Sequence, residues 1–137
     1  SVTVVVLDDA NRLLVVHRTD NDLWSIPGGA IDPGESVRQT AVRETKEETG
    51  YDVEVADLVG VYTDPRHVIA YSDGEVRSQF SICVRATVLG GRARTSSESS
   101  EVVWQAVDRL EKLSIHPTIR LRIDHALDEH RPAPWLT

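Results

Sequence analysis

The stretch from Gly29 to Tyr51, GAIDPGESVRQTAVRETKEETGY, decides the fold because it contains the clearest helix of the chain. Ser36 followed three residues later by Gln39 is a capping box, which is typical of a helix start. Gly50 is a favourable residue for ending a helix. The pattern therefore predicts a helix over residues 36–49. Its buried face is expected to consist of Val37, Ala41, Val42 and Thr45.

Strand-like runs precede this helix. Residues 2–7 and 13–17 are apolar and β-branched, and the turn-forming residues between them predict a hairpin. A short strand is expected at residues 24–26. It is expected to end at Pro27-Gly28-Gly29, which break regular pairing.

More strands and a second helix follow. Pro117 suits the first turn of a last helix, and residues 131–137, which contain two prolines, are expected to form a tail. This order of elements predicts one α/β (α+β) domain over residues 1–137, with helices packed on a mixed sheet. The further strands are expected at residues 53–61, 67–71, 76–89 and 102–107.

Length and composition limit the classes of function. A chain of 137 residues has the size of one domain. Its 22 Asp and Glu against 15 Lys and Arg give a net charge of −7, which argues against duplex nucleic acid as a partner. The longest aliphatic run, residues 4–7, is far below the ~18 residues of a membrane span, so no membrane partner is expected. The single cysteine, Cys83, excludes an internal disulfide, and we expect a cytoplasmic protein. The absence of methionine indicates a removed initiator or missing residues upstream of Ser1.

Three glutamates share one edge of the expected helix. At about 100° per residue, Glu44, Glu47 and Glu48 fall within about 100° of one another. Like charges at these spacings cost roughly 0.2–0.5 kcal/mol per pair, and the helix dipole disfavours anions near the C-terminal end. Arg43 can pair with one carboxylate, which leaves two without a counter-charge. A solvated acidic face and a divalent-cation site both fit this pattern, and Mg²⁺ suits a few carboxylates with water and phosphate oxygens.

The same stretch resembles the Nudix box, the motif of the Nudix hydrolase family. The box is Gly, five residues, Glu, seven residues, Arg-Glu, an aliphatic residue, any residue, Glu-Glu, any residue, Gly and an aliphatic residue. Thr45 and Tyr51 depart from the two aliphatic positions, which are packing positions. The fixed positions match in register at Gly29, Glu35, Arg43, Glu44, Glu47, Glu48 and Gly50.

This resemblance implies an α/β/α sandwich and hydrolysis of a nucleoside diphosphate linked to another moiety. Arg43 is expected to hold Glu47 in position, and Glu35 to support its neighbours or to contact a metal through water. Clustered metal ions suit a diphosphate because they stabilise charge on its oxygens and help to deliver water in line. The implied cofactor is Mg²⁺, or Mn²⁺, held by Gly29 (through its carbonyl), Glu44, Glu47 and Glu48.

Three carboxylates are candidates for the general base. Glu48 of the box is one candidate. Glu101 and Glu98, in the Ser-rich loop before Trp104, are placed like loop carboxylates that some relatives use as an extra ligand or base. Glu101 is the stronger of these two, and each also fits a solvated loop charge.

Residues outside the box are candidates for binding the substrate. Arg18, at the end of the second strand, can reach a phosphate bidentately. Trp24 can stack on a base or cap the core. Tyr62 and Arg66 follow a long strand and can line the mouth of the substrate site, although each alone also fits an ordinary surface position.

The leading interpretation is a Mg²⁺-dependent pyrophosphohydrolase with a small-molecule nucleotide substrate. The alternative is a catalytically idle Nudix module that binds a nucleotide for regulation, against which the complete box argues. Nucleoside triphosphates rank slightly ahead of ADP-ribose and other nucleotide sugars, because Pro65 lies near, but not in register with, a marker proline of ADP-ribose hydrolases in this family. The resemblance is also compatible with a homodimer, since dimers are common among relatives.

Overall fold

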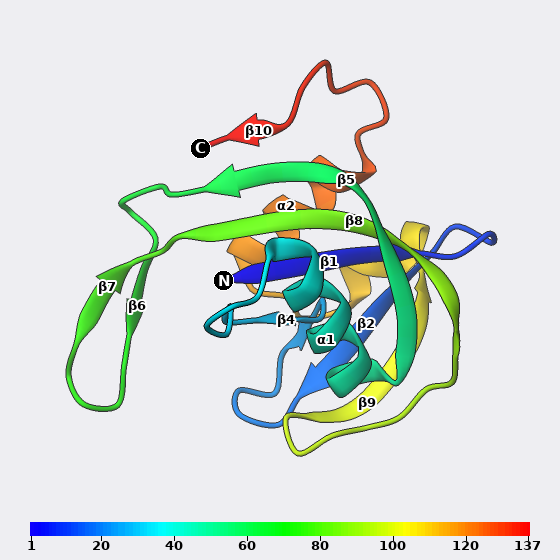
Figure 1. The fold of residues 1–137 in the computed structure, drawn as a ribbon, viewed down its shortest axis with the longest axis horizontal. Helices are drawn as coiled ribbons and strands as arrows, with labels where there is room; N and C mark the ends of the chain where they lie inside the picture. The colour runs from blue at the N-terminus through cyan, green and yellow to red at the C-terminus, as the bar shows by residue number, and fades with distance from the viewer.

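The computed structural model describes all residues 1–137 and contains ten strands, two α-helices and one 3₁₀-helix (Figure 1). None of the helices combines the length and the apolar character that a membrane crossing requires. In chain order the elements are β1 (Val2–Leu7), β2 (Arg12–Arg18), β3 (Trp24–Ser25), β4 (Gly28–Gly29), α1 (Val37–Thr49), β5 (Tyr51–Tyr62), β6 (Val68–Ala70), β7 (Val76–Ser78), β8 (Ser81–Gly91), β9 (Ser99–Ala106), η1 (Val107–Lys112), α2 (Pro117–Leu127) and β10 (Trp135–Leu136).

Eight strands form one mixed sheet in the order β10-β5-β8-β1-β2-β3, with β4 paired to β1 and β9 paired to β2. Strand β1 lies near the centre and runs parallel to β8. Its residues 2–6 are all buried. A strand buried on both faces reads as a continuous apolar run, which is how this segment reads in the sequence.

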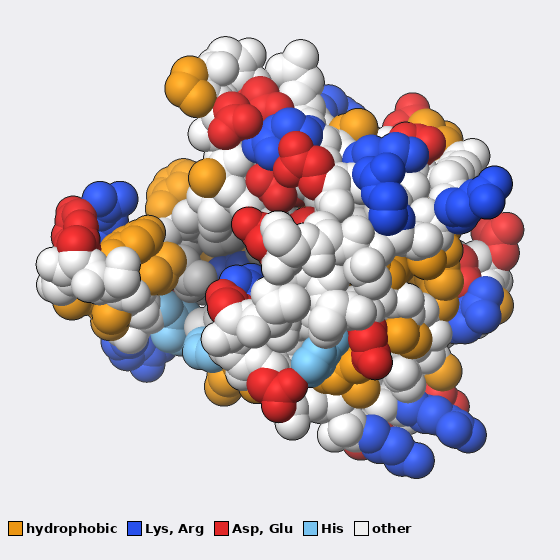
Figure 2. Space-filling model, turned by 90° about the horizontal axis from the view of Figure 1, so that it is seen from below, with side chains coloured by type: hydrophobic (Ala, Val, Ile, Leu, Met, Phe, Trp, Pro, Cys, Tyr) orange, Lys and Arg blue, Asp and Glu red, His pale blue; other side chains and the backbone are white.

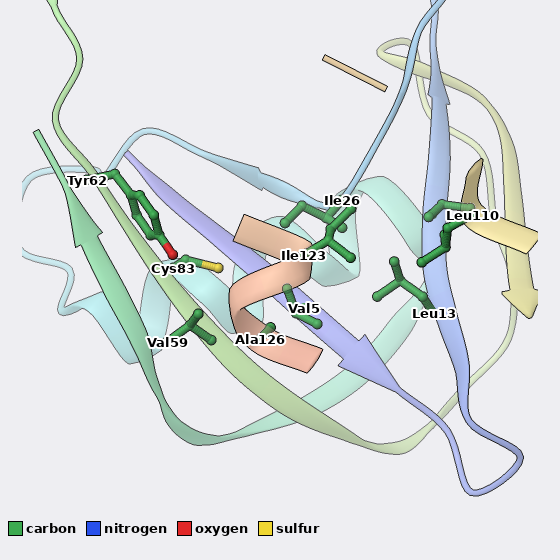
Figure 3. Close-up of a cluster of buried hydrophobic side chains, with 10 residues drawn as sticks. Val5, Leu13, Ile26, Val59, Tyr62, Cys83, Leu110, Ile123 and Ala126 are labelled. Carbon is green, nitrogen blue, oxygen red and sulfur yellow. The ribbon is translucent and has the colours of Figure 1, made fainter. Parts of the chain in front are cut away.

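Helices cover both faces of this sheet, α1 on one side and α2 with η1 on the other (Figure 1). Because side chains alternate along a strand, β1 contributes to both layers. Val4 and Val6 pack in a cluster with Ala41 of α1, whereas Val5 belongs to a cluster with Ile123 of α2, drawn in Figure 3. The expected fold class, an α/β/α sandwich around a mixed sheet, is confirmed.

Helix α1 forms as the local signals predict. Ser36 is the N-cap and makes the full capping box with Gln39, and Gly50 ends the helix at φ +84°. Such a φ favours glycine because it has no Cβ. The expected buried face is right for Ala41 and Thr45 but wrong for Val42, which is exposed.

The expected hairpin is present, because β1 and β2 pair antiparallel across a turn in which the Asp8 N–H donates to the Arg12 carbonyl oxygen. Its two strands pair with each other only at Leu7 and Leu13, and beyond that point β1 pairs with β8 and β4, and β2 with β9 and β3. One expectation about the following segment is wrong. Pro27-Gly28-Gly29 does not simply end a strand, since Gly28 and Gly29 themselves pair with β1. A Cβ on Gly28 would lie 2.4 Å from the Val2 carbonyl oxygen, so only glycine permits this approach.

The expected strand over residues 76–89 is split in two. Its first part, β7, pairs with β6 in a separate two-stranded hairpin, which projects from the sheet in Figure 1. The second part, β8, pairs with β5 and β1 in the main sheet. The hairpin and its flanks, residues 66–79, are called the projecting hairpin below.

Residues 131–137 are not a free tail. Strand β10 pairs in parallel with Gly60 and Val61 of β5. The ring of Trp135 stacks on His125 with 3.9 Å between ring centres. Arg131 reaches the Asp57 carboxylate at 3.2 Å. These contacts could not be predicted from the local sequence because they depend on distant parts of the chain.

Candidate active site

Helix α1 presents the three glutamates of one edge to different surroundings. Glu48 is 9% exposed, whereas the side chain of Glu47 is 58% exposed. Glu44 lies between these extremes and is largely covered. The edge is therefore buried on one side and open to solvent on the other.

Arg43 bonds to more carboxylates than the helix spacing predicts. Its Nη1 donates to Glu44 at 2.9 Å and to Glu47 at 3.2 Å. Its Nε and Nη2 donate to the two oxygens of Glu35 at 2.7 and 2.9 Å. Asp32 lies 3.4 Å away. The expectation of a single pair with Glu47 is too narrow, because the loop before α1 brings Glu35 and Asp32 to the same guanidinium.

Glu35 is held as an ionised residue by its neighbours. Besides the Arg43 bonds, its carboxylate accepts from the Asp32 backbone N–H and from the Thr40 hydroxyl, each at 3.0 Å. The Arg43 hydrogen bonds, followed by the Asp32 N–H, lower the pKa of Glu35 to about 2. Glu35 is therefore joined to the α1 edge through Arg43.

Glu48 is the carboxylate of this edge whose pKa is raised most strongly. Burial raises the pKa of Glu48 to about 8, and the charges of Glu44 and Glu98 add to this effect. The Gly28 backbone N–H opposes it by donating to Oε2 at 2.9 Å. Burial also raises the pKa of Glu44, where the charges of Glu47 and Glu98 contribute and Arg43 opposes them. Negative charge at this edge is therefore incompletely compensated by the protein.

Gly29 lies directly against Glu44. A Cβ at this position would be 2.4 Å from Glu44 Oε1. The backbone of β4 and the carboxylates of α1 thus meet at the point where the sequence suggested a carbonyl ligand.

These residues fit a hard divalent cation chemically. Oxygen ligands of carboxylates and carbonyls are what Mg²⁺ and Mn²⁺ prefer, and two carboxylates here have raised pKa values. The side chains as placed are turned to Arg43 and to the Gly28 N–H, and no three acidic, histidine or cysteine side chains converge in metal-ligand geometry.

The loop before β9 brings Glu98 to the site. The Ser99 hydroxyl donates to the Glu48 carbonyl oxygen at 2.9 Å, and the Thr19 backbone N–H donates to the Glu98 carbonyl at 3.1 Å. The Glu98 charge acts on Glu44 and Glu48. Glu101 lies on β9 opposite His17 and is exposed. Of the two loop carboxylates, Glu98 is thus the one whose charge acts on the α1 edge.

Arg18, Trp24 and Arg66 line one cavity of about 500 Å³ next to this edge. Hydrogen bonds to Asp20 raise the pKa of Arg18, and the charges of Glu48 and Glu98 contribute, so Arg18 links the cavity to the acidic edge. Arg66 is paired with Asp64 at 2.7 Å. In Figure 2 the projecting hairpin stands apart at the left, with a hollow between it and the body of the protein.

Tyr62 does not belong to this cavity. It is 3% exposed, packs in the core (Figure 3) and is hydrogen-bonded to His125 Nδ1 at 2.8 Å. The expectation that it lines the substrate mouth is wrong, because β5 runs to Tyr62 and turns its ring toward α2.

The sequence reading missed several residues of the cavity. Gln79 comes from the projecting hairpin, and His116 and Thr118 come from the start of α2. The only local signal was His116-Pro117, which marks a helix start. That signal gives no information about which cavity the helix start faces.

Comparisons with known proteins agree with this geometry. A family model described as "NUDIX domain" matches residues 1–126. A MutT-like protein of Streptomyces ambofaciens is 35% identical over 132 residues, which are 96% of this chain and 79% of that protein. An ADP-ribose pyrophosphatase of Methanocaldococcus jannaschii is 31% identical over 113 residues, or 80% of this chain and 63% of that protein.

Two solved structures share the fold. A UDP-X diphosphatase superposes with a TM-score of 0.79 at 20% identity, covering 99% of this chain and 65% of that one. An ADP-ribose pyrophosphatase of Streptococcus suis 89-1591 superposes with a TM-score of 0.72 at 23% identity, covering 98% and 94%. This chain spans less than two thirds of the length of some of these proteins, including the Methanocaldococcus jannaschii relative and the UDP-X diphosphatase.

Proposed function

Because this chain belongs to the Nudix family, we propose that it is a divalent-metal-dependent pyrophosphohydrolase. Its substrate is a nucleoside diphosphate linked to another moiety, either a nucleoside triphosphate or ADP-ribose and related nucleotide sugars. The observation that carries the proposal is Glu48, a buried carboxylate with a pKa of about 8 in an acidic group in which only Arg43 forms ion pairs. A solvated acidic face would not bury this group.

The residues that would hold Mg²⁺ or Mn²⁺ are Glu44, Glu47, Glu48 and the Gly29 carbonyl. When bound there, the metal would neutralise phosphate oxygens and lower the pKa of a coordinated water. Arg43 and Glu35 act as positioning residues, because the guanidinium joins Glu35, Glu44 and Glu47 in one hydrogen-bonded group. An acidic chain also requires a counter-charge before it can accept a polyanionic substrate.

Glu48 is also one candidate for the general base, since the Gly28 N–H holds its carboxylate in place. Glu98 is the alternative base that its influence on Glu48 supports. Glu101 stays the third candidate. Each would take the proton of the attacking water, and the conjugate acid would return it to solvent.

The cavity beside the edge would hold the rest of the substrate. Arg18 has the position to contact phosphate oxygens, because it lies at the cavity and feels the charge of Glu48. Trp24 would present its aromatic ring to a base or sugar, and Arg66 lines the same cavity. Cleavage is therefore expected within the pyrophosphate rather than at a terminal phosphomonoester.

Product analysis tests this proposal. The protein is incubated with Mg²⁺ and a panel of nucleoside triphosphates, ADP-ribose and nucleotide sugars, and products are separated by chromatography. We expect nucleoside monophosphate plus pyrophosphate from a triphosphate, or AMP plus ribose 5-phosphate from ADP-ribose. A parallel Glu48→Gln sample controls for contaminating hydrolases, and H₂¹⁸O shows which phosphorus is attacked. Release of inorganic phosphate alone would contradict the chemistry, and inactivity on the whole panel would favour the idle nucleotide-binding module.

A further inference from the structure

The cavity beside the acidic edge has several hydrogen-bond donors in its wall but no carboxylate. Although the chain carries a net charge of −7, no Asp or Glu lines this cavity. Figure 2 shows histidine side chains at the hollow beside the projecting hairpin. The Oδ1 of Asn21, another lining residue, accepts from the Leu23 N–H at 3.0 Å, which leaves the amide hydrogens of Asn21 free to donate. A ligand of this cavity therefore needs hydrogen-bond acceptors on its surface. The charged and titratable lining groups are Arg18, Arg66, His67 and His116.

His116 is held next to Trp24 in the wall of this cavity. The Trp24 backbone N–H donates to the Ser114 carbonyl oxygen at 2.8 Å. Trp24 also forms an isolated parallel β-bridge with Ile115, the residue directly before His116. Both His116 and Trp24 line the cavity. A base that stacked on the Trp24 ring would therefore lie in the part of the cavity that His116 borders.

The start of α2 fixes which ring nitrogen of His116 is free to bind a ligand. The Thr118 backbone N–H, which can only donate, lies 3.2 Å from His116 Nδ1. The Thr118 hydroxyl lies 2.9 Å from the same nitrogen. Nδ1 is therefore an acceptor, so the neutral ring carries its hydrogen on Nε2. His116 is exposed, and its Nε2 has no hydrogen-bond partner in the protein. The free nitrogen of His116 is thus a hydrogen-bond donor.

Other polar groups of the cavity do not distinguish a donor from an acceptor on a base. Arg18 feels the charges of Glu48 and Glu98, which places it at the phosphate end of the cavity. The side-chain amide of Gln79 makes no hydrogen bond with the protein, so it can turn either its oxygen or its nitrogen to a ligand. The Nε2 of His116 differs because it donates in both the neutral and the protonated ring.

We propose that His116 is a specificity-determining residue whose Nε2–H donates to the exocyclic keto oxygen of a nucleotide base. This inference rests on the proposed function, since it places the base of the substrate in this cavity against Trp24. Guanine and thymine carry a keto acceptor where adenine and cytosine carry an amino donor, and uracil shares the acceptor of thymine. An amino base sets donor against donor and leaves the Nε2–H unpaired. Among the candidate substrates, keto-base nucleoside triphosphates and nucleotide sugars are therefore favoured over ADP-ribose.

Two matched pairs of nucleotides test this exocyclic group. ITP carries a keto oxygen at C6 of the base where ATP carries an amino group, and UTP and CTP differ in the same way at C4. The kcat and KM of each triphosphate are measured with Mg²⁺. Binding is measured separately, as the Tm shift induced by the monophosphates IMP and AMP, and UMP and CMP. These have no pyrophosphate bond, so their binding is independent of turnover.

We expect the wild type to prefer the keto member of a pair by at least about fivefold in kcat/KM, and to show the larger Tm shift with the keto monophosphate. His116→Ser should abolish the preference, mainly through KM. Its Tm without nucleotide should stay close to that of the wild type, because serine is a favoured N-cap and can accept from the Thr118 N–H. His130→Ser is the matched control, since His130 is exposed and does not line the cavity. It should keep the wild-type preference.

Equal kcat/KM values and equal Tm shifts within both pairs would overturn the role of His116, and so would a preference that survives in His116→Ser. The absence of a Tm shift with all four monophosphates would also count against it. A keto preference in binding without any hydrolysis would contradict the proposed function and support His116. Hydrolysis without a keto preference would have the opposite meaning.

Discussion

The Gly28 backbone N–H donates a hydrogen bond to Glu48 Oε2 across 2.9 Å. Gly28 is itself fixed by pairing with Thr3 of the central strand β1. The buried carboxylate of α1 is thus held by the sheet on which the helix packs. This link explains how a charge-bearing group can be positioned inside a fold that disfavours its charge.

Glu48 is expected to make the metal-free protein less stable as the pH rises. The folded-state pKa of Glu48 is about 8, above the usual carboxyl value. Between pH ~4.5 and pH ~8 the folded protein holds a proton that the unfolded chain has lost, so the free energy of unfolding falls with rising pH. Thermal unfolding in a chelator from pH 5 to pH 8 measures this.

Glu48→Gln is the matched variant for that experiment, because it stays neutral and keeps a carbonyl oxygen for the Gly28 N–H. The lowered pKa of His125 acts in the opposite direction below pH ~6.5, but it is common to both proteins. The Tm difference between variant and wild type should therefore grow toward pH 8. A constant difference would show that Glu48 is ionised throughout.

Arg43→Lys should lower kcat/KM by at least about tenfold and reduce the Tm. The planar fork of arginine bonds to Glu35, Glu44 and Glu47 together, and a single ammonium group cannot replace that geometry. Arg38→Lys on the same helix is the control, because Arg38 donates only to the Val55 carbonyl oxygen. Wild-type activity in Arg43→Lys would contradict the positioning role assigned to Arg43.

Alanine substitutions at the adjacent Gly28 and Gly29 should have different effects, one on folding and the other on activity. In Gly29→Ala the new Cβ meets the terminal carboxylate of Glu44, which can move, so activity should fall while folding persists. In Gly28→Ala the new Cβ meets the Val2 carbonyl of the backbone, so the Tm should fall sharply. Gly90→Ala, where a Cβ has open space, controls for the substitution itself. Equal Tm values for all three proteins would refute this reading of β4.

Trp135→Ala should destabilise the protein by roughly 1 kcal/mol or more, because it removes the stacked partner of His125. The pKa of His125, which burial lowers, should rise toward its usual value, as NMR titration of the imidazole would show. Leu136→Ala is the control, since Leu136 is 81% exposed. If both variants unfold at the wild-type Tm, β10 does not stabilise the fold.

Local signals in the sequence explain why α1 was predictable and β4 and β10 were not. The capping box and Gly50 act within the helix itself, so the helix follows from neighbours in the chain. Strands of two residues have no periodicity, and their existence depends on pairing with β1 and β5. Tertiary pairing of this kind leaves no trace in a short window of sequence.

The candidate site was predictable to the extent that it lies on α1. Helical spacing placed Glu44, Glu47 and Glu48 on one edge, but it could not show that Glu48 is buried or that Arg43 also reaches Glu35. The Glu98 charge can raise the pKa values of Glu44 and Glu48 only because the start of β9 packs on the end of α1 through Ser99.

Calorimetric titration with Mg²⁺ at neutral pH tests the central claim most directly, because it measures metal binding without requiring the substrate. We expect the wild type to bind Mg²⁺, Glu48→Gln to bind at least about tenfold more weakly, and the control Glu54→Gln, an exposed β5 substitution, to match the wild type. Equal binding by all three proteins would contradict the assignment of the α1 edge as the metal site, and so would the absence of binding to the wild type.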